Sequence, residues 1–311
     1  MIKNQNKAFS LIELSIVILI IGLLVAGIVK GQGLYNKMKI ISAASLTNNS
    51  VVNSIPNLDA WYETTASKSF NSSDLQDGGQ INNWYDINPT MSEKKNLAKY
   101  SASYNLPTYK KNCINGLPCV DFNGIDQCLL SNNKINIVGA TTGTIFVVGQ
   151  TREGVVGNTA LYIGPTSGSV ARRQIVLDFS KDDESGNENA GISGYRFIGS
   201  NYIFNKPFND QDFISTWSWS SPDVSNDNFN LYINGVAQTK HSSTILGGKL
   251  NIANHKFTIG ASHNRVTGNA CTSFFNGSIA EIIIFRKNLR TAQRKSVEKY
   301  LSQKYGISVT H

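Results

Sequence analysis

Residues 9–29 read FSLIELSIVILIIGLLVAGIV, an apolar run that is interrupted only by two serines, two glycines and Glu13. As an α-helix rising about 1.5 Å per residue, this run measures about 31 Å, which matches the hydrocarbon core of a bilayer. Lys3 and Lys7 precede the run, and the next basic residue is Lys30. The positive-inside rule therefore predicts a membrane helix with a short cytoplasmic leader and with the bulk of the chain outside.

Glu13 lies within the first turns of this apolar run. A charged side chain inside a membrane span costs about 2.5–3.5 kcal/mol on insertion scales, so such a residue usually has a function. The run contains no Lys, Arg or His that could pair with it. A cut between Ala8 and Phe9 creates an α-amino group that is positively charged near neutral pH. If the amine of a neighbouring copy pairs with Glu13, the pair also sets the stagger between packed helices.

Two other kinds of targeting segment also contain an apolar run. A conventional secretory signal has a shorter apolar core followed by small residues and a cleavage site, whereas this run is longer and continues into a helical pattern. A plain signal anchor remains the alternative, but it does not explain Glu13.

The segment KAFSLIELSIVILIIGLL (residues 7–24) resembles the class III signal of type IV prepilins and type II secretion pseudopilins. The resemblance implies that a prepilin peptidase removes leader residues 1–8, cuts between Ala8 and Phe9, and methylates the new amine of Phe9. It also implies that Glu13 guides assembly with other pilin or pseudopilin subunits. One residue departs from the family pattern, because Ala8 stands where Gly is usual, and we expect slower cleavage.

The helical pattern continues beyond the apolar run. Leu34, Met38 and Ile41 recur at spacings of four and three residues, which predicts an amphipathic lower half that packs one face on the globular domain. We expect one pilin-type helix over residues 9–54. It should end before Pro56, because the residue preceding a proline disfavours the helical conformation.

Three glycines, Gly27, Gly31 and Gly33, lie where the apolar run gives way to the amphipathic half. Glycine lowers helix stability by about 1 kcal/mol relative to alanine. We expect these residues to allow bending or local melting of the helix in a filament.

From about residue 58 the period changes. Short segments rich in aromatic and β-branched residues, such as TIFVVGQT (144–151) and KFTIGAS (256–262), alternate with polar, glycine-containing stretches. Strands at such intervals without intervening helices predict a β-sandwich over residues 58–307. Within it, Asn234-Gly235 predicts a two-residue hairpin, because both residue types tolerate positive φ.

One further helix is predicted close to the C-terminus, in LRTAQRKSVEKYLSQKYG (289–306). Thr291 is its expected N-cap and Gly306 its expected terminator. The stretches INGLPCVDFNGIDQCL (114–129), FNLYINGVAQ (229–238) and FFNGSIAEIIIFRKNLRTAQRKSVEKYLSQKYG (274–306) resemble concanavalin A-like jelly rolls of the laminin G-like branch. The expected fold class is therefore α+β, with a long N-terminal transmembrane helix, a mainly antiparallel β-sandwich and a short C-terminal helix.

Four cysteines, Cys113, Cys119, Cys128 and Cys271, match no zinc-binding spacing and favour two disulfides in an oxidising compartment. Three pairings are possible. Cys113–Cys119, which brackets the turn-forming Asn115-Gly116, together with Cys128–Cys271 is favoured. Four buried free thiols are the alternative.

The sequence gives little indication of catalysis. Glycoside hydrolysis needs two converging carboxylates, and Glu281 in AEIIIFRK has no acidic partner at the period-two positions of its own strand. A structural hydrogen bond or salt bridge is the favoured role of Glu281, and we expect no enzyme activity. His241, His255 and His263 stand in polar contexts, where solvated side chains are expected. Trp217 and Trp219 share one sheet face, which favours core over a sugar-binding surface.

The charge distribution argues against two further kinds of partner, nucleic acid and a bound metal ion. The net charge of +8 is scattered over short basic pairs, which argues against nucleic-acid binding. No cofactor is expected, although Asp182, Asp183 and Glu184 are oxygen donors of the kind that calcium takes. Their spacing matches no calcium loop, so a solvated loop is favoured.

Together these features predict a minor pilin or pseudopilin-like subunit of the bacterial inner membrane, with its C-terminal domain in the periplasm or, after assembly, at the cell surface. The sandwich would serve adhesion or recognition of a surface glycan or protein. A membrane-anchored lectin-like protein that does not assemble is the alternative, and a glycoside hydrolase is less favoured.

Overall fold

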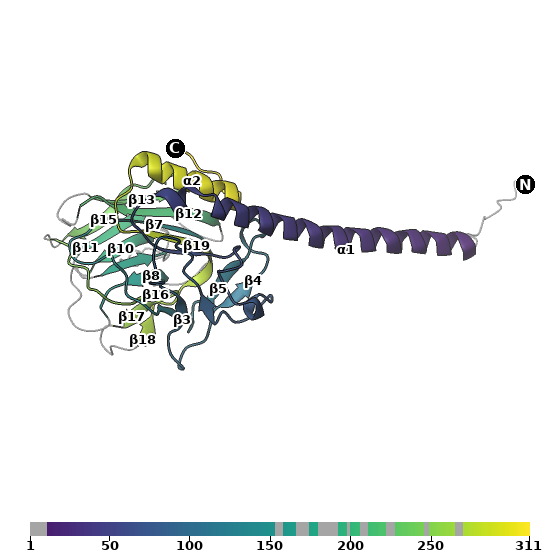
Figure 1. Cartoon of the computed structure of the whole chain (residues 1–311), viewed down its shortest axis with the longest axis horizontal. Helices are drawn as coiled ribbons and strands as arrows, with labels where there is room; N and C mark the ends of the chain where they lie inside the picture. Colours follow the sequence, from purple (N-terminus) through teal and green to yellow (C-terminus); the bar gives the residue numbers. More distant parts are fainter. Residues whose placement is uncertain are drawn as a thin grey trace, which may run out of the picture.

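The computed structural model describes residues 11–152, 158–165, 174–179, 192–197, 200–205, 211–221, 228–245, 249–264 and 270–311. A long helix, α1 (Leu11–Asn48), extends well beyond a β-sandwich and is joined to it at one end (Figure 1). Its 38 residues correspond to about 57 Å of helix. The regular helix ends earlier than the predicted residue 54, and a separate 3-10 turn, η1 (Val51–Ser54), follows it.

The sandwich has two antiparallel sheets. The first has the strand order β14-β13-β12-β7-β19-β5-β4, with β1 also paired to β19. Its strands are β1 (Leu58–Glu63), β4 (Thr108–Lys110), β5 (Cys119–Asn123), β7 (Gly143–Thr151), β12 (Asp212–Trp219), β13 (Phe229–Ile233), β14 (Val236–Ala237) and β19 (Asn276–Phe285).

The second sheet has the order β15-β11-β10-β9-β8-β16-β6-β3-β2. Its strands are β2 (Asn83–Trp84), β3 (Leu97–Lys99), β6 (Leu129–Ser131), β8 (Thr159–Ile163), β9 (Ile175–Asp178), β10 (Ile192–Phe197), β11 (Ser200–Asn205), β15 (Lys240–Ile245) and β16 (Phe257–Ile259). The remaining elements are the 3-10 turns η2 (Ser72–Asp74) and η3 (Ile114–Gly116), the small pair β17 (Ser262–Asn264) and β18 (Ala270–Thr272), and the helix α2 (Thr291–Tyr305).

Strand β19 organises the first sheet. Its sequence, NGSIAEIIIF, is apolar at most positions, and it is buried along almost its whole length. One edge of β19 pairs first with β5 and then with β1, while the other edge pairs with β7. Because β1 follows α1 and η1 in the chain, this pairing fixes where the long helix joins the sandwich.

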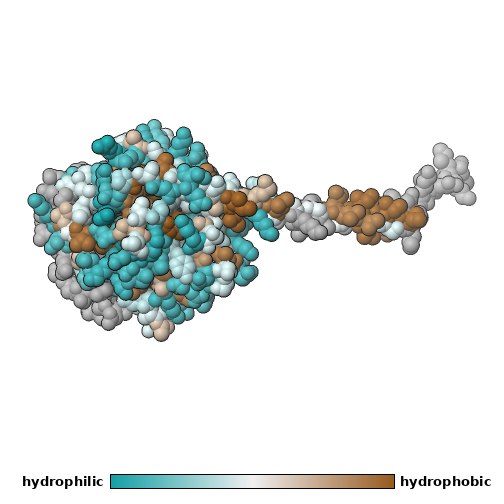
Figure 2. Space-filling view, viewed as in Figure 1, coloured by the Kyte–Doolittle hydropathy of each residue, from teal (hydrophilic) through white to brown (hydrophobic). Residues whose placement is uncertain are grey.

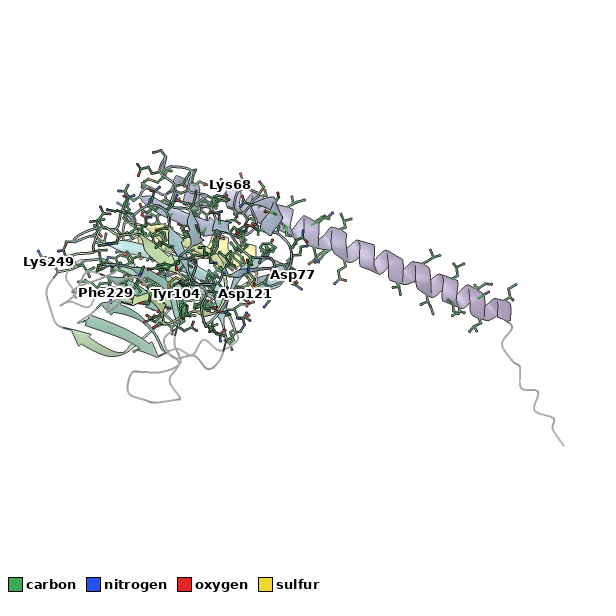
Figure 3. All side chains as sticks on the ribbon, turned by 90° about the horizontal axis from the view of Figure 1, so that it is seen from below. Lys68, Asp77, Tyr104, Asp121, Phe229 and Lys249 are labelled. Atoms are coloured by element: carbon green, nitrogen blue, oxygen red, sulfur yellow. A yellow bond between two sulfur atoms is a disulfide. The ribbon has the colours of Figure 1, made fainter. Side chains whose placement is uncertain are left out.

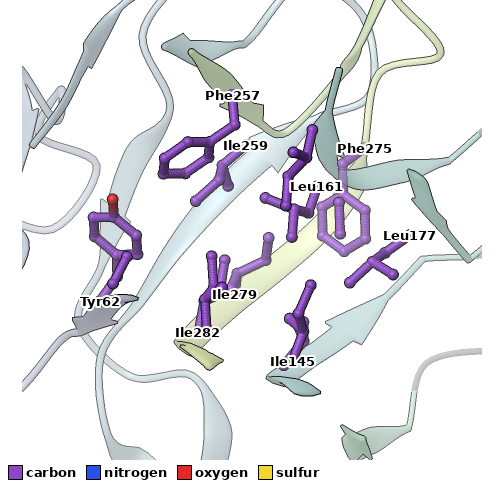
Figure 4. Packing of buried hydrophobic residues seen from close by; sticks show 14 of the residues in the cluster. Tyr62, Ile145, Leu161, Leu177, Phe257, Ile259, Phe275, Ile279 and Ile282 are labelled. Atoms are coloured by element: carbon purple, nitrogen blue, oxygen red, sulfur yellow. The ribbon is translucent and has the colours of Figure 1, made fainter. Parts of the chain in front are cut away.

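Two apolar layers hold the domain together. The layer between the sheets contains Tyr62, Ile145, Leu161, Phe257 and Ile282, which face one another in Figure 4. Both tryptophans of β12 belong to this layer and are fully buried, which confirms that they are core residues. The second layer lies on the outer face of the first sheet, where α2 and the end of α1 cover it.

The local turn and cap predictions hold with one shift. Asn234 and Gly235 have φ values of 51° and 81° and join β13 to β14, which confirms the hairpin. Gly306 ends α2 in the left-handed conformation at φ 66°, as predicted. The N-cap is Arg290, and Thr291 is already the first helical residue, so that cap was misplaced by one position.

The structure contains two disulfides, Cys113–Cys119 and Cys128–Cys271, the pairs that the sequence favoured. The first closes a short loop around Asn115 and Gly116, which both have positive φ. The second joins residues 143 apart in sequence. The long loop restricts the unfolded chain far more than the short one does.

Removal of the two disulfides should therefore have unequal effects. On the chain-entropy relation, replacing Cys128 and Cys271 with alanine lowers the free energy of unfolding by about 5 kcal/mol, against about 2 kcal/mol for replacing Cys113 and Cys119. Urea denaturation of the two double variants, followed by tryptophan fluorescence, measures both values. Equal losses would contradict the loop-length argument.

His263 is not the solvated side chain that the sequence suggested. It is 2% exposed and lies opposite Cys271 in the β17–β18 pair. Its ring packs against Tyr100 and Tyr162, and its Nε2 has no hydrogen-bond partner within the described residues. The polar sequence context misled because β17 packs against β8 of the second sheet, which encloses the side chain. Burial lowers the pKa of His263 to about 4, so the imidazole is neutral at pH 7.

This burial predicts a pH dependence of stability. Because the folded-state pKa of His263 is depressed, its contribution is fully present above the unfolded value of about 6.5 and is lost as pH falls toward about 4. Thermal denaturation at pH 7 and pH 4.5 should give a larger drop in Tm for the wild type than for His263→Phe. An identical drop in both proteins would show that this imidazole is accessible to water.

Candidate functional site: the exposed helix and its anchor

The first half of α1 is an apolar surface that the other described residues leave uncovered. The large apolar side chains described between Ile12 and Val25 are each 50–67% exposed, all around the helix. Figure 2 shows this hydrophobic segment projecting away from a mostly hydrophilic domain. Soluble monomers rarely expose apolar patches of this extent, which therefore mark a membrane or protein contact.

The sequence predicts that residues 9–29 span the membrane. Judged on the residues that the structure describes, no helix combines the length and the apolar character needed to cross a bilayer.

The second half of α1 contacts the sandwich along a narrow strip. Ala43 and Thr47, one helical turn apart, are 3% and 1% exposed and pack against α2 and the outer face of the first sheet. The predicted stripe of Leu34, Met38 and Ile41 does not pack on the domain, because these residues are 61–68% exposed. That prediction was wrong because α1 has already left the sandwich at residue 34, and Ile41 lies on the side away from the buried strip.

A buried charge cluster lies beneath this strip. Lys304 of α2 places its Nζ 2.8 Å from Oε2 of Glu63 in β1 and 2.8 Å from Oε2 of Glu281 in β19. The two carboxylates lie opposite one another in the β1–β19 ladder. The same ammonium group donates to Thr47 Oγ1 of α1 at 2.7 Å. One cation therefore links the first strand, the last strand and both helices.

Hydrogen bonds complete the coordination of both carboxylates. Glu281 accepts from the Trp61 indole at 2.7 Å and from the hydroxyls of Tyr300 and Tyr305, each at 2.9 Å. Glu63 accepts from the backbone and side chains of the loop that follows β1: Thr65, Ala66 and Ser69. Buried charges are tolerated when they are paired and hydrogen-bonded in this way.

The pKa values of the cluster follow from this arrangement. Burial alone would raise the pKa of Glu63, but the Lys304 charge and the hydrogen bonds outweigh it and lower the pKa to about 2. Burial would likewise lower the pKa of Lys304, but the two carboxylates raise it above its usual value. Burial raises the pKa of the Tyr300 and Tyr305 hydroxyls well above 10. These pKa shifts keep Glu63 and Lys304 ionised, and Tyr300 and Tyr305 neutral, across the physiological pH range.

Removing the cation should destabilise the domain and reverse its response to acid. Lys304→Met leaves two buried carboxylates without their cation, at a cost of about 3–5 kcal/mol. In the wild type the depressed pKa of Glu63 means that stability falls as pH drops from about 4.5 to about 2. In the variant the unpaired carboxyls should have raised pKa values, so stability should increase as pH falls from 7 to 5.

Urea denaturation of detergent-solubilised wild type and variant at pH 7 and pH 5 measures both effects. Exposed Lys299→Met, in the same helix, is the matched control and should change the free energy of unfolding by less than about 0.5 kcal/mol. A Lys304→Met protein as stable as the control at pH 7 would contradict the assignment.

A second contact joins α1 to the short disulfide loop. Lys39 donates from Nζ to Oδ1 of Asn115 at 3.0 Å. Asn115 also lies against Gly306, where a Cβ would approach its side chain to within 2.7 Å. The Cys113–Cys119 loop therefore touches both α1 and the end of α2.

The structure locates only some of the predicted site residues. Ala8 and Phe9 lie outside the described residues, as do Asp182, Asp183 and Glu184, and of Glu13 the backbone alone is described within α1. The structural role expected for Glu281 is confirmed by its salt bridge. The sequence did not reveal its partners Glu63 and Lys304, because they come from other elements. One signal in the sequence could have indicated a buried carboxylate: Glu63 ends the strand segment LDAWYE, next to Trp61 and Tyr62.

Comparisons with known proteins match the N-terminal segment and the sandwich separately. Residues 3–29 match the family model described as the prokaryotic N-terminal methylation motif. None of the curated proteins compared with the chain matches it.

Among the solved structures that are similar to this chain, two illustrate the sandwich. Domain 4 of AbnA, an extracellular arabinanase from Geobacillus stearothermophilus solved with arabinotriose, is 16% identical, with a TM-score of 0.50 over 78% of this chain and 98% of that one. An arabinofuranosidase solved with arabinofuranosyl-alpha-1,2-xylobiose is 11% identical, with a TM-score of 0.53 over 80% of this chain and 63% of that one. At these identities the likeness establishes the fold alone. The chain thus joins a type IV pilin-like class III signal to a jelly-roll-like β-sandwich.

Proposed function

We propose that this chain is a pilin-type structural subunit, a minor pilin or pseudopilin, that assembles through α1 and carries its sandwich outside the inner membrane. The observation that carries the proposal is the coincidence of two features in one segment. The methylation motif covers residues 3–29, and the helix that it opens exposes apolar side chains on every side. Such a helix is suited to lipid before assembly and to neighbouring helices afterwards.

The proposed steps of insertion, processing and assembly follow from this segment. The apolar residues 9–29 insert in the inner membrane, a prepilin peptidase removes residues 1–8, and the amine of Phe9 is methylated. Glu13 then pairs with the amine of an adjacent subunit, because an unpaired carboxylate is costly in a low-dielectric environment. The buried cluster of Lys304, Glu63 and Glu281 supports this proposal, since it would transmit force on α1 directly to the sandwich.

For the sandwich we propose adhesion or recognition, with no enzyme activity. A surface glycan is the ligand class most in keeping with the fold, because the similar domain of AbnA was solved with arabinotriose. Glu63 and Glu281 lie opposite one another in the β1–β19 ladder, and glycoside hydrolysis also uses two carboxylates. Both side chains are fully buried and bonded to Lys304, so a sugar could not reach them without unfolding α2.

Analysis of the native N-terminus tests the processing step. Mass spectrometry of the chain from cells should find that residues 1–8 are absent and that Phe9 carries one added methyl group. Glu13→Leu should leave cleavage intact and lower recovery in sheared filaments at least ten-fold, whereas Ser15→Leu should not. An intact Met1, with normal behaviour of Glu13→Leu, would favour a membrane-anchored lectin that does not assemble.

A further inference from the structure

Beyond Glu13, every charged residue of α1 is a lysine. Lys30, Lys37 and Lys39 occur within ten residues, and no acid stands between Glu13 and Asp59. Exposed helices gain stability when opposite charges stand three or four residues apart, and this helix has no such pair here. Lysines on the outer side of a membrane span also oppose the orientation that the leader lysines favour. Neither helix stability nor insertion therefore explains these three residues.

The Cys113–Cys119 loop brings two further lysines to the same part of the helix. Lys110 ends β4, and Lys111 follows it into the loop. The loop touches α1, because Lys39 donates from Nζ to Oδ1 of Asn115 at 3.0 Å. Figure 1 shows β4 at the side of the sandwich from which α1 projects. We name the following five residues the basic collar: Lys30, Lys37, Lys39, Lys110 and Lys111.

The positive charge of the collar is largely unpaired. Among the described residues, no carboxylate forms an ion pair with Lys37, Lys39 or Lys111. The acid beside the collar is Asp77, whose Oδ1 accepts a hydrogen bond from the backbone N–H of Lys111 at 2.8 Å. In Figure 3, Asp77 lies at the edge of the sandwich next to the projecting part of α1. Unpaired ammonium groups therefore surround the helix where it leaves the domain.

The collar lies close to lipid headgroups if residues 9–29 span the membrane. The polar layer of a bilayer is about 5–8 Å thick on each side. Lys30 directly follows the span, and Lys37 and Lys39 lie about 12 Å and 15 Å beyond Val29 along the helix axis. The last two are thus about 4–10 Å above the headgroups, which is about one Debye length at physiological salt. Their flexible four-carbon stems reduce that gap further.

Tyr35 has the position of an aromatic residue at a membrane interface. It is 62% exposed, and it lies about 9 Å beyond Val29, close to the level of the headgroups. Tyrosine is enriched at this depth because its ring is apolar and its hydroxyl is polar. The Nζ of Lys39 lies 5.8 Å from the centroid of this ring, so the aromatic and the cationic group share one side of the helix.

We propose that the basic collar binds the anionic headgroups of the membrane in which α1 is inserted and holds the sandwich against that membrane before assembly. The chemistry recognised is a phosphate anion. Lipid is its source because the span keeps the collar within reach of the headgroups at all times. The inference rests on the proposed function and adds to it a partner and a position for the unassembled subunit.

Amine labelling of the full-length chain in nanodiscs tests this contact. The nanodiscs contain either phosphatidylcholine or phosphatidylglycerol, and mass spectrometry gives the rate at which a water-soluble reagent acetylates each lysine. In phosphatidylglycerol, Lys37, Lys39 and Lys111 should react at least about three-fold more slowly, and high salt should remove the difference. Lys249 is the internal control, because it is exposed and lies at the opposite edge of the sandwich in Figure 3. It should react at the same rate in both lipids.

A double variant separates binding from simple proximity to the charged surface. If the collar holds the sandwich, Lys37→Gln combined with Lys111→Gln should release it. The labelling rate of Lys39 in phosphatidylglycerol should then rise at least about two-fold, toward its rate in phosphatidylcholine. The matched control Lys249→Gln should leave the rate unchanged. Full protection of Lys39 in the double variant would show that the lysines are merely near the surface, and would overturn the collar.

The remaining outcomes separate the two proposals. Equal labelling of the wild type in both lipids, in a chain that stays with the nanodiscs on gel filtration, overturns the collar and leaves the pilin-type function standing. Equal protection by inorganic phosphate or by duplex DNA in phosphatidylcholine nanodiscs would indicate a site for a soluble anion, and also overturns the collar. A chain that separates from the nanodiscs is not inserted, and both proposals then fail.

Discussion

A single buried ammonium group joins both helices to the first and last strands of the sandwich. Lys304 bonds to carboxylates on the first and last strands of the sandwich and to a hydroxyl near the end of the long helix. Replacing such a cluster with well-packed apolar residues often leaves a protein equally stable. We therefore interpret the cluster as fixing the orientation of α1 and α2 on the sheet, because the hydrogen-bond geometry allows one arrangement where apolar packing would tolerate several.

The neighbouring contacts reinforce that orientation. Thr47 also shares a hydrogen bond with Tyr300, and Trp61 meets the Tyr300 ring edge-on at 6.4 Å. About two turns closer to the N-terminus of α1, Lys39 bonds to the disulfide-closed loop. The helix is thus held at two levels, Lys39 and Thr47, which are two turns apart. Two separated contacts resist tilting of the helix in a way that one cannot.

Much of this architecture could be predicted from the sequence, because local patterns encode it. Each of these patterns is encoded by residues close together in the sequence. Examples are the apolar run that starts at Phe9, the Asn234-Gly235 hairpin and the Gly306 terminator. The predictions that failed depended on distant parts of the chain. His263 was misread because its burial comes from Tyr100 and Tyr162, and the Leu34 stripe was misread because periodicity says which face is apolar but not what covers it. The Lys304 cluster could not be found by spacing, since its members come from three separate elements.

The position of the anchor in the sequence has a consequence for biogenesis. The helix that it holds is synthesised before the sandwich, whereas β19 and Lys304 are made after every other described strand. If the chain is exported as proposed above, a partly exported chain has no defined angle between α1 and the sandwich, because the strand and the cation that set the angle have not yet been translocated. On that proposal, only a chain translocated beyond Lys304 has this joint, so the order of synthesis distinguishes subunits that have passed this point from those that have not.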